Sequence, residues 1–262
     1  MTGMFKAELL KLRRRRFVIG VTIGAVAFAL LSALTVFLSA TGPGEHAAAR
    51  GATVESLGQA GGATQAFSLG ASFIGILVLV LFIANFAGEF TQGTFRTLLM
   101  RQPRRLALLA GKMTALLAFV AAVMLLAEVL TVAASAAIAP TQDISTAPWF
   151  SLDGLGEAAG DYATSMLGVS SWATFGMALA IFVRSIPVGL GIGIVWSGPF
   201  EHLVADAWSG ASHWFPGLLL EALAAGGTPD VSVARALTLV GIYVAAAASG
   251  AALVFARRDI TA

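Results

Sequence analysis

Apolar residues gather into six long runs along the chain, separated by shorter polar connections. A helix needs about 20 predominantly apolar residues to cross the hydrocarbon core of a bilayer. The pattern therefore predicts an all-α polytopic membrane protein with six transmembrane helices and no second domain. The expected spans are residues 17–40, 66–88, 113–139, 162–183, 186–206 and 234–256, each with approximate bounds.

Two of these spans need a closer look. The first follows a basic N-terminal stretch, as a secretory signal peptide would, but it is 24 residues long, whereas a signal peptide has an apolar core of about 7–15 residues. We expect it to be retained. The fifth span is the weakest, because Pro187, Pro199, Glu201, His202 and Asp206 all fall within it.

Composition agrees with a membrane protein. Hydrophobic residues make up 58% of the chain and charged residues 11%, and the mean hydropathy is +0.86. A soluble domain has about a quarter charged residues, so this chain could not cover its surface in water. With a net charge of +2 and no basic cluster interleaved with aromatic residues, nucleic acid is not expected as a partner. The absence of cysteine excludes disulfides and thiolate metal sites.

Positive charges set the orientation, because cytoplasmic connections carry an excess of lysine and arginine. Of the 16 basic residues, all but Arg50 and Arg235 fall on one side of the expected spans. Six spans then place both termini in the cytoplasm. We expect a multi-pass protein of a bacterial cell membrane.

The residues before the first span predict an interfacial helix. Over residues 4–16, Phe5, Leu9 and Leu12 share one face, and Lys6 and Arg13 lie on another. A basic amphipathic helix of this kind lies on the membrane surface. It could equally be a plain topology anchor.

The connection between the second and third spans also predicts a short helix. Pro103 disfavours helical geometry at Gln102, so a new helix should begin near Arg104. Apolar and basic residues separate on the short helix, with Phe95, Leu98 and Leu99 on one face and Arg96, Arg101 and Arg105 elsewhere.

This connection resembles the permease subunits of ABC-2 type exporters. The resemblance rests on the run Glu89-x3-Gly93-Thr94-x-Arg96-x-Leu98-Leu99-x3-Pro103-x-Arg105 followed by Lys112, on Glu8 and Lys11 with the arginines before the first span, and on the ending Phe255-Ala256-Arg257-Arg258-Asp259-Ile260. It implies a single ABC-2 type transmembrane domain over residues 1–262 with a type V exporter fold. A coupling helix between spans two and three would dock on a separate ATPase, and residues 197–227 would form re-entrant helices between spans five and six.

The resemblance also implies which residues couple the permease to the ATPase. Gly93 would permit the turn into the coupling helix, and Glu89 would pair with Arg96 or with the ATPase. Phe95 and Leu98 would fill a groove on the ATPase. The remaining two, Arg101 and Arg105, would face acidic partners or lipid phosphates.

The sequence predicts that this chain alone does not hydrolyse ATP. The nearest fragment to a phosphate-binding loop, at Gly111-Lys112, lacks the first glycine and the following Ser or Thr. We therefore expect no enzyme activity and no cofactor in this chain, with ATP and Mg²⁺ bound by an ABC ATPase dimer. A second permease copy or paralogue is a further expected partner, and Gly20-x3-Gly24 and Gly189-x3-Gly193 permit close helix contacts within the chain or between copies.

Polar residues inside the spans suggest a substrate pathway. Charged side chains are costly in the bilayer and usually face an interior; those here are Glu128, Glu201 and His202. Glu128 could instead be a protonated side chain hydrogen-bonded between helices. Metal binding by Glu201 and His202 with Asp206 is disfavoured, since their spacing puts Glu201 and Asp206 on different helix faces.

The leading hypothesis is an ATP-driven exporter of an amphipathic or lipidic substrate, such as a drug, peptide or lipid. The alternative is a stand-alone proton-coupled secondary transporter that uses Glu128.

The orientation can be tested with single cysteines. Cysteines at Ala48, Thr146 and Gly227 should react with an impermeant maleimide on intact cells, whereas those at Gly3 and Thr97 should react only after permeabilisation. The chain has no native cysteine, so each variant reports on one site. External labelling at Thr97 would overturn the orientation.

Overall fold

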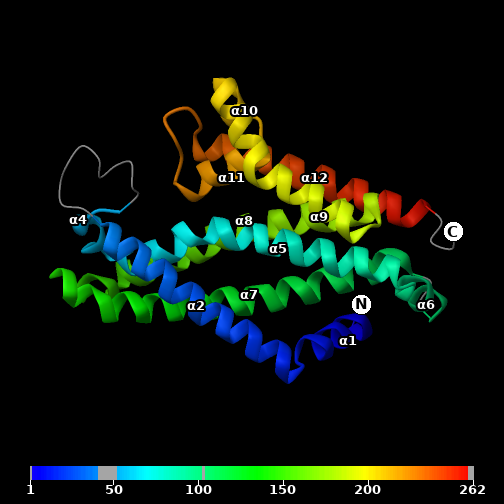
Figure 1. Cartoon of the computed structure of the whole chain (residues 1–262), viewed down its shortest axis with the longest axis horizontal. Helices are drawn as coiled ribbons and strands as arrows, with labels where there is room; N and C mark the ends of the chain where they lie inside the picture. Colours follow the sequence, from blue (N-terminus) through cyan, green and yellow to red (C-terminus); the bar gives the residue numbers. More distant parts are fainter. Residues whose placement is uncertain (1, 41–51, 102–103, 259–262) are drawn as a thin grey trace. The chain divides into compact units, whose positions relative to one another are not determined.

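Helices make up 87% of the residues that the structure describes, and no strand occurs among them. The structure, a computed structural model, describes residues 2–40, 52–101 and 104–258 (Figure 1). Ala48, Pro103 and the pair Asp259-Ile260, which carry parts of the sequence-based expectations, lie outside these ranges.

Within these ranges, six helical segments are long and apolar enough to cross a membrane, which confirms the six predicted spans. They are α2 (Arg15–Ser39), α5 (Gln65–Thr91), α7 (Arg105–Ile138), α8 (Leu152–Val183), the segment Ile186–Ala207 and α12 (Val233–Arg257). Several of these helices extend beyond the apolar runs, because backbone hydrogen bonding continues into the polar flanks. Thus α7 begins at Arg105 and not at residue 113.

The fifth segment is interrupted near its middle. It consists of α9 (Ile186–Val195), a π-helical turn η4 (Trp196–Phe200) and α10 (Glu201–Ala207). Pro199 lies in the π turn. Proline has no N–H and its ring clashes with the preceding turn, so the helix widens there, as helices often do at such positions.

Shorter helices connect these segments. They are α1 (Thr2–Leu12), α4 (Val54–Leu57), α6 (Thr94–Arg101) and α11 (Pro216–Ala224), with 3-10 turns η1 (Ala60–Ala63), η2 (Ala139–Gln142), η3 (Ala147–Phe150) and η5 (Ser209–His213). Short helical pieces between spans five and six are therefore present, and their re-entry into the bilayer stays a prediction. The N-terminal helix is shorter than predicted: it ends at Leu12, and α2 begins at Arg15. The break falls within four consecutive arginines, whose like charges repel along a continuous helix.

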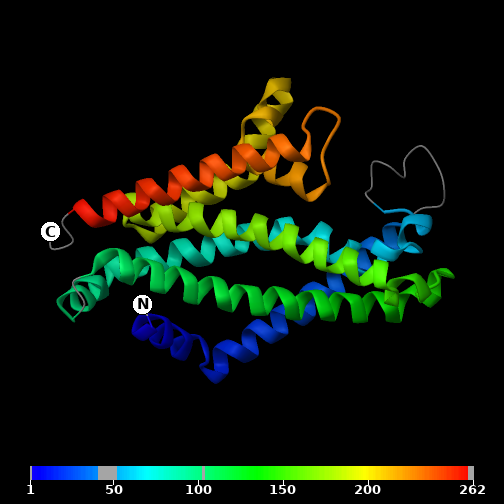
Figure 2. The ribbon, with the colours of Figure 1, turned by 180° about the vertical axis from the view of Figure 1, so that it is seen from behind.

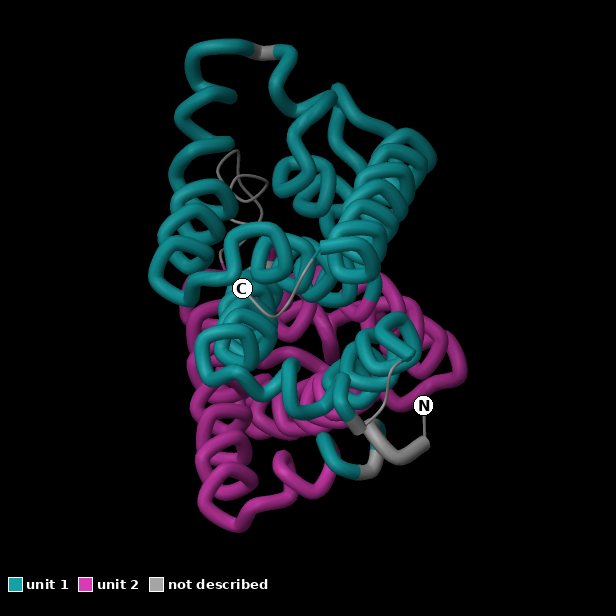
Figure 3. The backbone as a smooth tube through the Cα atoms, turned by 90° about the vertical axis from the view of Figure 1, so that its right-hand side faces the viewer, with its two compact units in different colours: residues 1–8, 72–117, 167–262 teal, residues 9–71, 118–166 magenta. Residues whose placement is uncertain are grey.

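The chain divides into two compact units (Figure 3). Unit 1 comprises residues 1–8, 72–117 and 167–262, and unit 2 comprises residues 9–71 and 118–166. In unit 2, Phe37, Leu57 and Trp149 are buried together, and the Trp149 indole N–H donates to the Leu57 carbonyl at 2.8 Å.

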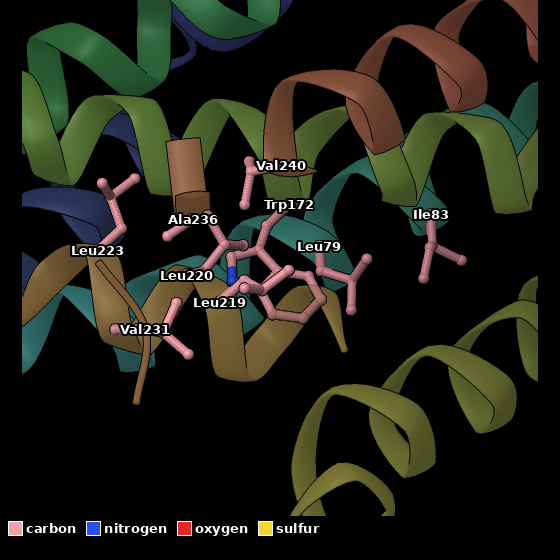
Figure 4. Close-up of a cluster of buried hydrophobic side chains, with 10 residues drawn as sticks. Leu79, Ile83, Trp172, Leu219, Leu220, Leu223, Val231, Ala236 and Val240 are labelled. Carbon is pink, nitrogen blue, oxygen red and sulfur yellow. The ribbon is translucent and has the colours of Figure 1, made fainter. Parts of the chain in front are cut away.

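In unit 1, α11 lies against α12 (Figures 1 and 2). Figure 4 shows the apolar cluster beneath them, in which leucines of α11 meet Ala236 and Val240 of α12 and Trp172 of α8. Leu79 and Ile83 of α5 complete it. The segment between the fifth and sixth spans is thus anchored by apolar packing.

Close approach of α8 to α5 in unit 1 depends on a glycine. A Cβ atom at Gly176 would lie 2.7 Å from the carbonyl oxygen of Leu79, which is backbone and cannot yield easily. Elsewhere on α8, a Cβ atom at Gly168 would meet nothing within 4 Å.

Gly176→Ala should therefore destabilise the protein by about 1–3 kcal/mol through overpacking. Gly168→Ala is the matched control and should be neutral or stabilising by up to about 1 kcal/mol, because alanine favours helix. Thermal unfolding of the purified variants in one detergent, followed by tryptophan fluorescence, measures the difference. Equal midpoints for the two variants would show that the approach is not tight at Gly176.

Candidate functional site

The connection between α5 and α6 is a tight turn at Gly93. Its φ is 67°, in the left-handed region that glycine adopts without steric penalty. Helix α6 starts at the next residue, Thr94. The turn expected at Gly93 is thus present, and its part in coupling to an ATPase stays a prediction.

Helix α6 has one covered side and one open side. Phe95 has no exposed surface, and Leu98 and Leu99 are half-buried. On the other side Arg96, Thr97 and Met100 are exposed, Met100 by 75%. We call these last three residues the exposed face of α6. The side chain of Arg101 lies outside the described part of the protein.

Phe95 packs within unit 1 in a cluster of three phenylalanine rings. Its ring centroid lies 4.7 Å from that of Phe90, at the end of α5, and 5.2 Å from that of Phe255, near the end of α12. The guanidinium of Arg184 lies 5.0 Å from the Phe90 ring, a favourable cation–π contact. We call Phe90, Phe95 and Phe255 the aromatic cluster.

The expectation that Phe95 fills a groove on the ATPase is therefore wrong. The pattern placed Phe95 on an apolar face correctly, but this face is covered by the protein's own helices. The ring acts on α6 from inside, by fixing it to α5 and α12.

A buried lysine lies close to this cluster. Lys112 of α7 has no exposed surface, and its Nζ lies 2.6 Å from Oε1 of Glu89 and 3.8 Å from Oε1 of Glu8. The ammonium is also 5.2 Å from the centroid of the Phe86 ring. Glu8 belongs to α1 and Glu89 to α5, so a charged triad joins residues of three helices within unit 1.

The triad changes the interpretation of Glu89. We expected Glu89 to pair with Arg96 or with the ATPase, whereas its carboxylate bonds Lys112 and is buried. Arg96 lies on the exposed face of α6 instead. Removing one member of a buried charged pair leaves an uncompensated charge and is strongly destabilising, so Glu89 holds the end of α5 against α7.

The side chain of Arg105 caps the C-terminal end of α12. Its Nη1 donates toward the carbonyl oxygens of Phe255, Ala256 and Arg258 at 3.4, 3.2 and 3.1 Å. The last carbonyls of a helix lack partners within the helix and carry a partial negative charge, which suits an arginine. Arg105 thus has an internal role at the end of α12, and the expectation that it faces acidic partners or lipid phosphates stays a prediction.

Glu128 is buried inside unit 2. It is 6% exposed, and its Oε1 has no hydrogen-bond partner among the described residues. Thr131 and Ser135 follow on the same face of α7 and have no exposed surface. The Thr131 hydroxyl donates to the Ala127 carbonyl at 2.8 Å. We call Glu128, Thr131 and Ser135 the polar stripe of α7.

Glu201 and His202 lie in unit 1 and have different surroundings. Glu201 is buried, and its Oε2 accepts the N–H of Leu218 at 3.0 Å, at the first turn of α11. His202 is exposed, with Nε2 3.3 Å from a carboxylate oxygen of Glu221. A Cβ atom at Gly217 would lie 2.5 Å from the Glu201 carboxylate. Glu201 thus caps α11 from α10, and no group of three metal-ligating side chains occurs in the described ranges.

The comparison with known families identifies the chain. Residues 4–197 match the family described as ABC-2 family transporter protein. The chain belongs to this family. No curated protein and no solved structure matches it. As an ABC-2 permease it is a multi-pass membrane protein and the membrane subunit of a transporter, and the family associates with an ABC ATPase.

The geometry of this ABC-2 permease includes contacts that the sequence interpretation missed. Glu8, Lys112 and Phe255 were part of the family resemblance, but nothing showed that they meet Glu89 and Phe95. One signal was available: a lysine inside an apolar helix requires an acidic partner, and Glu89 is the first acidic residue before Lys112 along the chain.

Lys112→Met should destabilise the permease by about 3–5 kcal/mol, because two buried carboxylates lose their counter-ion. Adding Glu89→Gln should restore part of the loss. Arg104→Met, which removes an exposed charge beside the same helix, is the control and should have little effect. Thermal unfolding in detergent measures all three, and a Lys112→Met variant as stable as the control would contradict the triad.

Proposed function

We propose that this ABC-2 permease is the membrane subunit of an ATP-driven exporter and that α6 is its coupling helix. The observation that carries the proposal is the division of α6 into a fixed inner side and an open outer side. Phe95 holds the helix in the aromatic cluster, and Arg96, Thr97 and Met100 face outward. A separate ATPase would bind this exposed face.

The connections of α6 suit a part that transmits movement. The helix joins α5 through a two-residue turn, and α5 is bonded to α7 through Glu89 and Lys112. Arg105 links the start of α7 to the end of α12. Pushing on the exposed face would therefore displace three membrane helices together and would not merely bend a loop.

ATP and Mg²⁺ would be bound by an ATPase dimer, one subunit for each of two permeases, in a bacterial cell membrane with both permease termini in the cytoplasm. For contact with a second permease copy or a paralogue we favour Gly20 and Gly24 of α2, which are exposed and where a Cβ atom would meet nothing within 4 Å. Gly189 and Gly193 are used internally, since added Cβ atoms would lie 2.9 and 2.8 Å from Ile83.

The polar stripe of α7 supports an amphipathic or lipidic cargo. Polar side chains in an apolar helix would interact with the polar part of such a cargo, and the surrounding apolar side chains would accompany its tail. The same buried Glu128 is what favours the alternative, a stand-alone proton-coupled transporter. Export that persists when the proton gradient is collapsed at constant ATP would argue against that alternative.

Binding of the ATPase can be tested on the exposed face of α6. Arg96→Glu combined with Met100→Ser should reduce the co-purifying ABC ATPase at least tenfold, because arginine and large apolar side chains are typical interface anchors. The tagged permease is purified from membranes of its own host, and ATPase is quantified by mass spectrometry at matched permease levels.

The control is Arg235→Glu, the same charge reversal at an exposed site on the opposite side of the expected membrane. Phe95→Ser is unsuitable as a first test because it would disrupt the aromatic cluster and reduce stability. The double variant should have the same thermal midpoint as the unaltered protein. If it does and still co-purifies with the same amount of ATPase, α6 is not the docking element.

A further inference from the structure

The C-terminal end of α12 is the red end of the ribbon in Figure 1. An open pocket lies at this helix end. Its volume is about 460 Å³, and it combines an apolar wall with two guanidinium groups. The lining residues are Phe182, Leu253, Val254, Arg257 and Arg258. All belong to unit 1, and Phe182 comes from the last turn of α8.

The pocket is held in shape by hydrogen bonds between helix ends. Nη1 of Arg258 donates to the Phe182 carbonyl at 3.4 Å, one of the carbonyls that the end of α8 leaves without a helical partner. The Arg258 carbonyl in turn accepts from Arg105 at 3.1 Å. The ends of α7, α8 and α12 are thereby tied together, so both walls of the pocket are in place before a ligand arrives.

The apolar wall is exposed on two membrane-spanning helices. Leu253 is 55% exposed and Phe182 43%. Leu253 lies one helical turn before Arg257, so the Cα atoms of an apolar residue and an arginine that both line the pocket are about 6 Å apart along the helix axis. A ligand that fills this pocket needs an anionic head followed directly by an apolar chain.

We propose that the pocket binds one anionic phospholipid. Its phosphate lies on Arg257 and on the remaining N–H groups of Arg258, and its acyl chain lies along Leu253 and Phe182. Guanidinium groups bind phosphate oxygens in a bidentate manner. Basic pockets between the ends of spanning helices are typical sites for anionic headgroups. The proposal depends on the membrane location of the chain and not on the coupling role of α6.

A phospholipid accounts for the pocket better than a free anion does. Inorganic phosphate would use the two arginines and leave the wall of Phe182, Leu253 and Val254 uncovered. A zwitterionic lipid would cover the wall but would add a cationic group next to two guanidinium groups.

The test measures lipid retention on the purified full-length permease by native mass spectrometry. Delipidated protein is mixed with dioleoyl phosphatidylglycerol, dioleoyl phosphatidylcholine or inorganic phosphate. We expect one phosphatidylglycerol to be retained, with much weaker retention of phosphatidylcholine and no competition by phosphate at millimolar concentration.

Arg257→Gln should weaken phosphatidylglycerol retention about fivefold, the change that corresponds to about 1 kcal/mol for one basic residue at an anionic headgroup. Arg257→Lys should keep most of the retention. Arg235→Gln, at the other end of the same helix, is the control and should change nothing.

Three results would overturn the proposal: equal retention of both lipids, displacement of the lipid by phosphate alone, or equal effects of Arg257→Gln and Arg235→Gln. Because the permease is measured without an ATPase, failure here leaves the proposed coupling role untouched.

Discussion

A lysine ammonium with no access to solvent has to be neutralised inside the protein, because transfer of an unpaired charge to an apolar interior is prohibitive. Lys112 meets this requirement with Glu89 from α5 and Glu8 from α1. The pairing fixes how the start of α7 lies against the end of α5. Helix α6 is suspended between these same two helices, so the position of its exposed face depends on one buried ammonium group.

Two further interactions fix α6 and the helices next to it: the packing of the aromatic cluster and the hydrogen bonds of Arg105. The aromatic cluster contributes apolar contact area, which is largely indifferent to direction, and it brings Phe255 of α12 against Phe95. Arg105 adds directional hydrogen bonds to the last carbonyls of α12. The ion pairs of Lys112, the packing of the three rings and the hydrogen bonds of Arg105 all lie within unit 1. Together they hold α6 and the helix ends next to it.

The spans were predictable because a bilayer leaves little choice: every crossing needs a long apolar helix. The turn at Gly93 was predictable for a similarly local reason, since few residues other than glycine adopt a positive φ. The partners of Phe95, Glu89 and Arg105 were not predictable. Periodicity shows which residues share a helix face, but not whether that face is covered by a second protein or by residues far away in the same chain, such as Phe255 and Lys112. The π turn at Pro199 was predictable in part. A proline indicates that the regular helix is interrupted, but it does not indicate whether the interruption is a kink, a break or a π turn.

The triad also determines the order in which the protein can be completed. Glu8 is synthesised long before Lys112, and at about 5–20 residues per second the delay is on the order of 5 to 20 s. During that interval the first spans enter the membrane before the ammonium that links α1 to α5 has been made. The N-terminal helix, although made first, can therefore form its ion pair with α7 only after the start of the third span has been synthesised.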